Sequence, residues 1–158
     1  MIGRTGVQAL KALLELAQDP GGWRSVSALA AAQSLPAPHL EQLLLRLRRA
    51  GVLEARRGRQ GGYRLACRPE ELALSRVLRA VGAWPGAGGA PGQAEPGPTE
   101  PGSAEGADPA TERVAFLLRQ RLSRAIEREL AQLTLAELLF DLRSARAGLS
   151  EEGGLMLG

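Results

Sequence analysis

The sequence predicts a mainly α-helical protein, and three observations support this fold class. Of the 158 residues, 44% are hydrophobic but only 3% are aromatic, so alanine and leucine supply most of the apolar surface. Apolar residues recur at steps of three and four positions, which is the spacing of one helix face. A chain of this length supports one main core with an appendage.

Composition divides the chain into four parts. Residues 82–111 contain 8 Gly and 6 Pro and no Lys or Arg, which predicts a flexible linker that cannot build a core. The preceding residues 1–81 form the predicted main domain. Residues 112–147 are predicted to form helices, and residues 148–158 a disordered tail.

Three helices, a hairpin and a short helix are expected within residues 1–81. The apolar spacing, the capping serines Ser25 and Ser27, and the breaks at glycine and proline define their limits. The predicted helices contain residues 7–17, 27–34, 38–50 and 75–81, and the predicted strands are 52–54 and 63–66, joined by the Gly-rich turn 57–62.

This order of elements is that of a winged helix-turn-helix domain, whose third helix can enter the major groove of DNA. Leu40, Leu43, Leu44 and Leu47 share one face of that helix and are expected in the core. The hairpin carries four arginines and no acid between residues 56 and 64, which suits contact with phosphates or a narrow minor groove. Residues 1–81 hold 13 basic and 6 acidic residues, a net charge of +7.

A long apolar stripe is predicted on the helix that follows the linker. A lone helix this apolar needs a partner, so the stripe predicts a homodimer. Thr134 is expected to cap a second helix over residues 135–146. The predicted dimerisation residues are Val114, Leu118, Leu122, Ile126 and Leu130.

Three segments resemble the iron-sulfur cluster regulator (IscR)-like family, also called the Rrf2 family, of winged helix-turn-helix transcription regulators. Residues 39–53 read HLEQLLLRLRRAGVL and resemble its recognition helix and first wing strand. Residues 57–65 (RGRQGGYRL) resemble its wing, and residues 133–138 (LTLAEL) the segment after its long dimerisation helix. The resemblance spans roughly residues 1 to 146, apart from the linker. It implies a homodimer that binds double-stranded DNA at a pseudo-palindromic operator, and it leans towards repression.

Eight residues are predicted to contact DNA. The resemblance implies base-edge contacts from the start of the third helix and a minor-groove contact from Arg57. Glutamine pairs well with adenine and glutamate accepts from cytosine, while arginines further along the helix are better placed for phosphates. Contact between His39 and DNA, and simple solvation of its ring, both remain open. The eight residues are Pro38, His39, Glu41, Gln42, Arg46, Arg49, Arg57 and Arg59.

We expect neither a metal nor a cofactor. Cluster-binding members of the family carry three cysteines in the linker as iron ligands, whereas residues 82–111 contain no Cys or His. The single cysteine, Cys67, is expected to be half-buried, with a redox role as the alternative. A single cysteine cannot form a disulfide within the chain, which fits a reducing compartment. No apolar run in the sequence is long enough to span a membrane. We therefore expect a cytoplasmic protein with no membrane partner. The effector stays open.

The sequence argues against an enzyme. The only histidine, His39, has no evident nucleophile beside it, and the glycines of residues 58–62 lack the ending of a phosphate-binding loop. Two alternatives remain open. One is an adaptor whose winged domain binds a protein, and the other is an iron-sulfur-sensing regulator with non-standard ligands.

Overall fold

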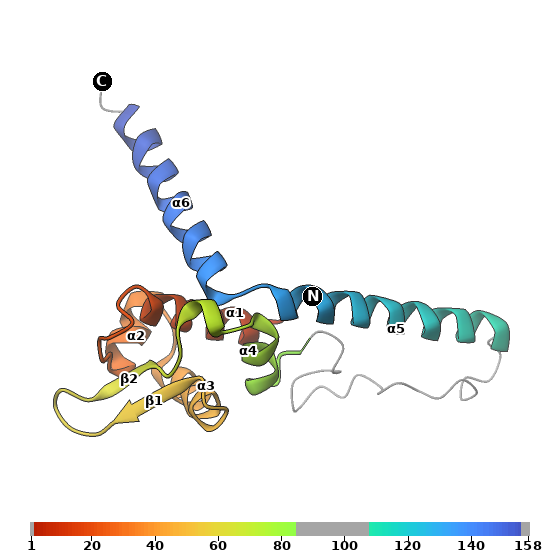
Figure 1. The fold of residues 1–158 in the computed structure, drawn as a ribbon, viewed down its shortest axis with the longest axis horizontal. Coiled ribbons are helices and arrows are strands. Elements are labelled where there is room, and N and C mark those ends of the chain that lie inside the picture. Colours follow the sequence, from red (N-terminus) through yellow and green to blue (C-terminus); the bar gives the residue numbers. More distant parts are fainter. Residues whose placement is uncertain (1, 85–107, 156–158) are drawn as a thin grey trace.

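The computed structural model describes residues 2–84 and 108–155, and it confirms the mainly α fold with a small hairpin (Figure 1). The winged domain holds four helices, two strands and a 3-10 turn, and two long helices follow. In chain order the elements are α1 (Arg4–Ala17), α2 (Val26–Gln33), α3 (Ala37–Arg49), β1 (Leu53–Arg56), β2 (Gly62–Leu65), η1 (Pro69–Glu71), α4 (Leu74–Ala80), α5 (Pro109–Gln132) and α6 (Leu135–Leu155).

The first three helices meet through leucines that are fully buried. The predicted stripe of α3 is confirmed, because Leu40, Leu44 and Leu47 are 0% exposed and Leu43 is 1% exposed. Burial of one such side chain contributes roughly 1.5–3 kcal/mol relative to an exposed position. The buried leucine face therefore fixes which face of α3 points outwards.

The limits of α2 follow the predicted capping chemistry. Ser25 is the N-cap, and its hydroxyl oxygen accepts a hydrogen bond from the Ala28 amide at 3.1 Å. The helix ends at Ser34, which adopts a left-handed conformation with φ of 51°. This short helix thus closes the turn before α3 with its terminal backbone groups partly satisfied.

The hairpin pairs β1 with β2 in antiparallel register, with Leu53 opposite Leu65. It is also joined to the connection between α1 and α2, because Arg24 and Tyr63 exchange two backbone hydrogen bonds of 3.0 and 2.8 Å. Gly62 makes this approach possible: its φ is 138°, and a Cβ there would lie 2.3 Å from the carbonyl oxygen of Arg24. Tyr63 is 9% exposed, which confirms that it packs at the base of the wing.

The junction between α5 and α6 is attached to the winged domain by backbone hydrogen bonds. The amide of Leu74 donates to the carbonyl of Leu133, and the amide of Leu135 donates to the carbonyl of Leu72, both at 2.9 Å. From this junction the two helices extend away from the winged domain in different directions (Figure 1). The predicted cap is confirmed, because Thr134 accepts from the amide of Glu137 at 3.4 Å.

Two predicted boundaries need correction. Helix α6 continues to Leu155, whereas the sequence predicted an end near Arg146 and a disordered tail from residue 148. Gly148 lies inside this helix, since glycine weakens a helix without preventing it. Helix α5 begins at Pro109 after the N-cap Asp108, inside the predicted linker. Most of that linker, residues 85–107, lies outside the described residues.

None of the helices in residues 2–84 and 108–155 combines the length and apolarity needed to cross a bilayer.

Candidate nucleic-acid interface

Helix α3 presents a polar face on the side opposite its buried leucines. The first two turns expose four of the predicted contact residues, and the last turn exposes arginines. Three residues separate the end of α3 from the start of the wing at Leu53, so the two basic elements are adjacent in sequence and in the fold (Figure 1). The exposed residues of α3 are Ala37, Pro38, His39, Glu41, Gln42, Arg46, Arg48 and Arg49.

His39 is exposed but already has a partner within the domain. Its Nε2 lies 2.7 Å from Oε1 of Gln8 on α1. Because a side-chain amide oxygen only accepts, Nε2 is the donor in this arrangement and Nδ1 is left for other contacts. This contact holds the ring at the N-terminal end of α3, and both readings of His39 remain compatible with it.

Arg46 also makes a contact that the sequence did not reveal. Its Nη1 donates to the carbonyl oxygen of Val81 at 3.1 Å, just after the end of α4. Carbonyl groups at a helix C-terminus lack partners within the helix, so this bond joins α3 to α4. A guanidinium has five N–H donors, which leaves others for a phosphate.

The four arginines of the wing divide into two pairs. Arg57 and Arg59 lie in the turn and are exposed. The guanidinium carbons of Arg56 and Arg64 instead lie 4.6 and 4.5 Å from the ring centroid of Trp23. Such distances are typical of cation–π contacts. Only the first pair is therefore presented at the tip of the wing.

The second pair is further restrained by polar contacts. Arg64 donates from Nε to Oε2 of Glu54 at 2.9 Å, and Arg56 donates from Nη2 to the carbonyl of Gln60 at 2.6 Å. We call Trp23, Arg56 and Arg64 the wing latch. Sequence reasoning missed it, and the available signal was a tryptophan in a glycine-rich connection of a chain with few aromatic residues.

Glu15 anchors the connection that carries Trp23. Its carboxylate accepts hydrogen bonds from Arg24 at 2.9 Å and from Gln18 and Gln33 at 3.0 Å each. The Glu15 side chain is only 14% exposed, so these charge-assisted bonds are partly shielded from water. The wing latch is thereby held against α1 and α2.

The predicted dimerisation stripe divides into an exposed part and a covered part. Val114, Leu118 and Leu122 are 66%, 56% and 54% exposed. Ile126 and Leu130 instead pack in a cluster with Leu74 and Leu78 of the same chain. Only the N-terminal part of the stripe is therefore apolar surface that α4 leaves uncovered.

Cys67 is half-buried, as predicted. Burial raises the pKa of its thiol, the nearby Arg76 cation opposes this rise, and the Glu71 carboxylate adds to it. The net effect keeps the thiol protonated at neutral pH.

These features define a class of protein: a winged helix-turn-helix DNA-binding domain followed by long helices. Residues 2–141 match the Rrf2 family model, which is described as an iron-dependent transcriptional regulator. The chain therefore belongs to the Rrf2 family and is a DNA-binding transcription regulator, and its relatives are regulators rather than enzymes.

Two of the relatives match nearly the whole chain. A putative HTH-type transcriptional regulator of Synechocystis sp., slr0846, is 36% identical over 90% of both chains. The HTH-type transcriptional regulator NsrR of Geobacillus kaustophilus is 33% identical over 92% of this chain and 94% of its own.

Solved structures agree with these relatives. IscR of T. potens has a TM-score of 0.65 at 29% identity, covering 92% of this chain and 90% of its own. CymR of B. subtilis, described as its global cysteine regulator, has a TM-score of 0.62 at 26% identity over 88% of this chain and 95% of its own.

The donor set of this chain does not fit the iron-sulfur cluster that the family resemblance implies. Such clusters are held mainly by cysteine thiolates, four for the common types, and the sequence has one Cys and one His. Within the described ranges, no three His, Cys, Asp or Glu side chains gather where they could hold a metal ion. We therefore assign no cluster ligand to any residue.

Proposed function

We propose that this regulator binds a pseudo-palindromic operator as a homodimer, recognises its sequence through α3 and the wing, and represses transcription. The observation that carries the proposal is the exposed first part of α3 beside a wing whose tip presents two arginines. The assigned family favours DNA as the partner over the protein-binding adaptor.

The contact residues divide by chemistry. Glu41 and Gln42, with Pro38 and His39, face base edges in the major groove, where amides and carboxylates discriminate bases. Arg49 contacts phosphates. Arg46 can also contact a phosphate, through the guanidinium N–H groups that do not bind the carbonyl of Val81. Arg57 and Arg59 enter the minor groove, where a narrow groove attracts arginine.

The homodimer rests on the exposed stripe of α5. Val114, Leu118 and Leu122, together with the neighbouring Leu117, form an apolar surface that a second copy can cover. A twofold dimer places two recognition helices on half-sites about one helical turn of DNA apart. In this organisation residues 1–81 bind DNA, and the exposed stripe of α5, which begins at Pro109, forms the dimer contact.

A dimer on DNA represses where its operator overlaps the promoter, and the family resemblance leans the same way. The cytoplasm, where the DNA lies, is the proposed location. Neither a membrane nor a cofactor has a part in this mechanism.

The test starts with selection of genomic fragments by the purified full-length protein. A shared motif with two inverted half-sites is expected, and recovery of random fragments would contradict sequence recognition. Transcription of a reporter behind a recovered operator should fall when the protein is present. A rise would overturn repression while leaving DNA recognition intact.

Substitutions then separate the two kinds of contact. Arg57→Ala should weaken operator binding more than random-DNA binding, by roughly 1–3 kcal/mol, as expected of a groove contact. Arg48→Ala, on the exposed face of α3, is the matched control and should weaken both equally while lowering the salt dependence. Equal losses for Arg57→Ala on operator and random DNA would defeat its assignment to the groove.

A further inference from the structure

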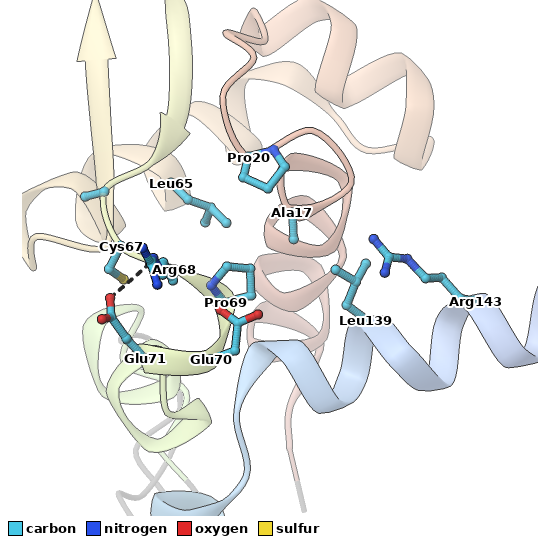
Figure 2. A pocket seen from close by; sticks show the side chains of 11 residues that line it. Ala17, Pro20, Leu65, Cys67, Arg68, Pro69, Glu70, Glu71, Leu139 and Arg143 are labelled. Atoms are coloured by element: carbon cyan, nitrogen blue, oxygen red, sulfur yellow. Dashed lines mark hydrogen bonds between the residues drawn. The ribbon is translucent and has the colours of Figure 1, made fainter.

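A cavity of about 570 Å³ lies between helix α6 and the winged domain, and Figure 2 shows the side chains that line it. The residues that line it come from outside α3. Its walls come from the end of α1, the segment joining β2 to η1, and the first turns of α6. This volume lies in the range of small-molecule sites, which is roughly 300–1,000 Å³.

Part of the cavity wall is apolar. Ala17, Leu65 and Leu139 line it and are 0%, 6% and 6% exposed, so these core side chains offer a ligand only small apolar edges, mainly those of Leu65 and Leu139. Cys67 also lines the cavity, and its protonated thiol adds a wall without charge. An apolar group of a ligand would be removed from water here.

Charged side chains flank this apolar surface, and they are Arg68, Glu70, Glu71 and Arg143. Glu71 already accepts a hydrogen bond from the backbone amide of Arg68 at 3.2 Å. Figure 2 shows Arg143 of α6 and Glu70 of η1 on opposite sides of Leu139. The ion pairs found within residues 2–84 and 108–155 involve neither Arg143 nor Glu70. A guanidinium pairs with a carboxylate through two parallel hydrogen bonds, and a glutamate accepts from an ammonium group. The arrangement is complementary to a ligand with both charges and an apolar side chain.

We propose that this cavity binds a small zwitterion of the α-amino-acid class with an apolar side chain, and that occupancy changes the affinity of the protein for its operator. The ligand carboxylate pairs with Arg143, its ammonium group with Glu70, and its side chain packs on Leu65 and Leu139. The regulatory half of this proposal rests on the proposed function, whereas the binding half does not.

A hydrogen-bonded chain connects the cavity wall to the wing. One turn after Arg143, Arg146 donates to Oε1 of Gln18 at 2.6 Å, and Gln18 donates to Glu15 at 3.0 Å. Glu15 accepts from Arg24, whose backbone pairs with Tyr63 of β2. A ligand that shifts α6 against α1 therefore acts on contacts that position the wing.

Calorimetry on the full-length protein tests the binding half. L-leucine, L-methionine and L-phenylalanine are the probes, and at least one should bind saturably. For a probe that binds, the N-acetyl and the amide derivatives should each bind about twofold to fivefold more weakly, because each loses one charge that pairs with an exposed side chain. No saturable heat from any of the three up to about 10 mM would overturn the site.

Variants locate the site. Arg143→Gln and Glu70→Gln should each weaken binding by about twofold to fivefold, because both side chains are exposed to water, whereas Arg113→Gln, an exposed arginine at the far end of α5, should leave it unchanged. Binding that is unchanged by both cavity substitutions would place the ligand elsewhere and overturn the assignment.

Operator binding by the same preparations tests the regulatory half. A saturating amino acid should change operator affinity at least about threefold in the natural protein. Gln18→Ala should keep calorimetric binding but lose the effect on DNA. Unchanged operator affinity despite ligand binding would overturn the coupling. Failure of the ligand-free protein to bind any operator would instead refute the proposed function, while the calorimetric result for the cavity would stand.

Discussion

Replacing Trp23 with alanine removes the centre of the wing latch and should loosen the wing without touching the exposed arginines at its tip. The substitution deletes two cation–π contacts, those of Arg56 at 4.6 Å and Arg64 at 4.5 Å. The backbone pairing of Arg24 with Tyr63 remains. The wing therefore keeps one of its two attachments to the connection between α1 and α2.

The expected loss in the free energy of unfolding follows from these two contacts. Each cation–π contact at a partly exposed position contributes about 0.5–1 kcal/mol, so the pair contributes about 1–2 kcal/mol to the free energy of unfolding. Arg64 keeps its ion pair with Glu54, which limits the loss. Trp23→Phe preserves a ring in the same place and should cost less than Trp23→Ala, since a phenyl ring binds cations more weakly than an indole.

Urea unfolding at one fixed protein concentration measures the change, because the stability of a dimer depends on concentration. A double-mutant cycle of Trp23→Ala with Arg56→Ala isolates one contact and should give a coupling of about 0.5–1 kcal/mol. Strictly additive single losses would refute the latch. Operator affinity should fall for Trp23→Ala, while binding to random DNA should change less.

Three further substitutions or measurements test the rest of the account. Gly62→Ala should lower the free energy of unfolding in urea by about 2 kcal/mol or more, because the added Cβ would lie 2.3 Å from the carbonyl oxygen of Arg24. This loss should exceed that of Gly58→Ala, where a Cβ would meet open space. Equal losses would contradict the steric reasoning. Leu118→Asp should convert the dimer to a monomer in light scattering, since it places a charge in the proposed apolar interface, and an unchanged mass would remove Leu118 from that interface. Protein purified without oxygen should be colourless with negligible iron, and a brown protein with bound iron would overturn the expectation of no cluster.

Much of the fold could be predicted because its signals are local. The stripe from Leu40 to Leu47, the cap at Ser25 and the break at Gly51 lie within short segments, and each reports the backbone conformation directly. The cap formed by Thr134 is equally local. The predicted end of α6 near Arg146 was wrong, because the helix tolerates Gly148 and continues to Leu155.

The contacts within the site depend on residues far apart in the chain. Trp23 meets Arg64 only after the hairpin folds back onto the first connection, and Arg46 meets Val81 only after α4 docks. No sequence spacing encodes these pairs. The same reason explains why the covering of Leu130 by α4 could not be predicted from the stripe alone.

Because the α5–α6 junction is attached to Leu72 and Leu74, the geometry of the proposed dimer does not depend on the length of the linker. The C-terminal end of helix α5 is attached to the winged domain. The backbone of that domain therefore fixes the position of this end of the helix. Insertions or deletions between residues 85 and 107 can then accumulate without altering the spacing of two recognition helices.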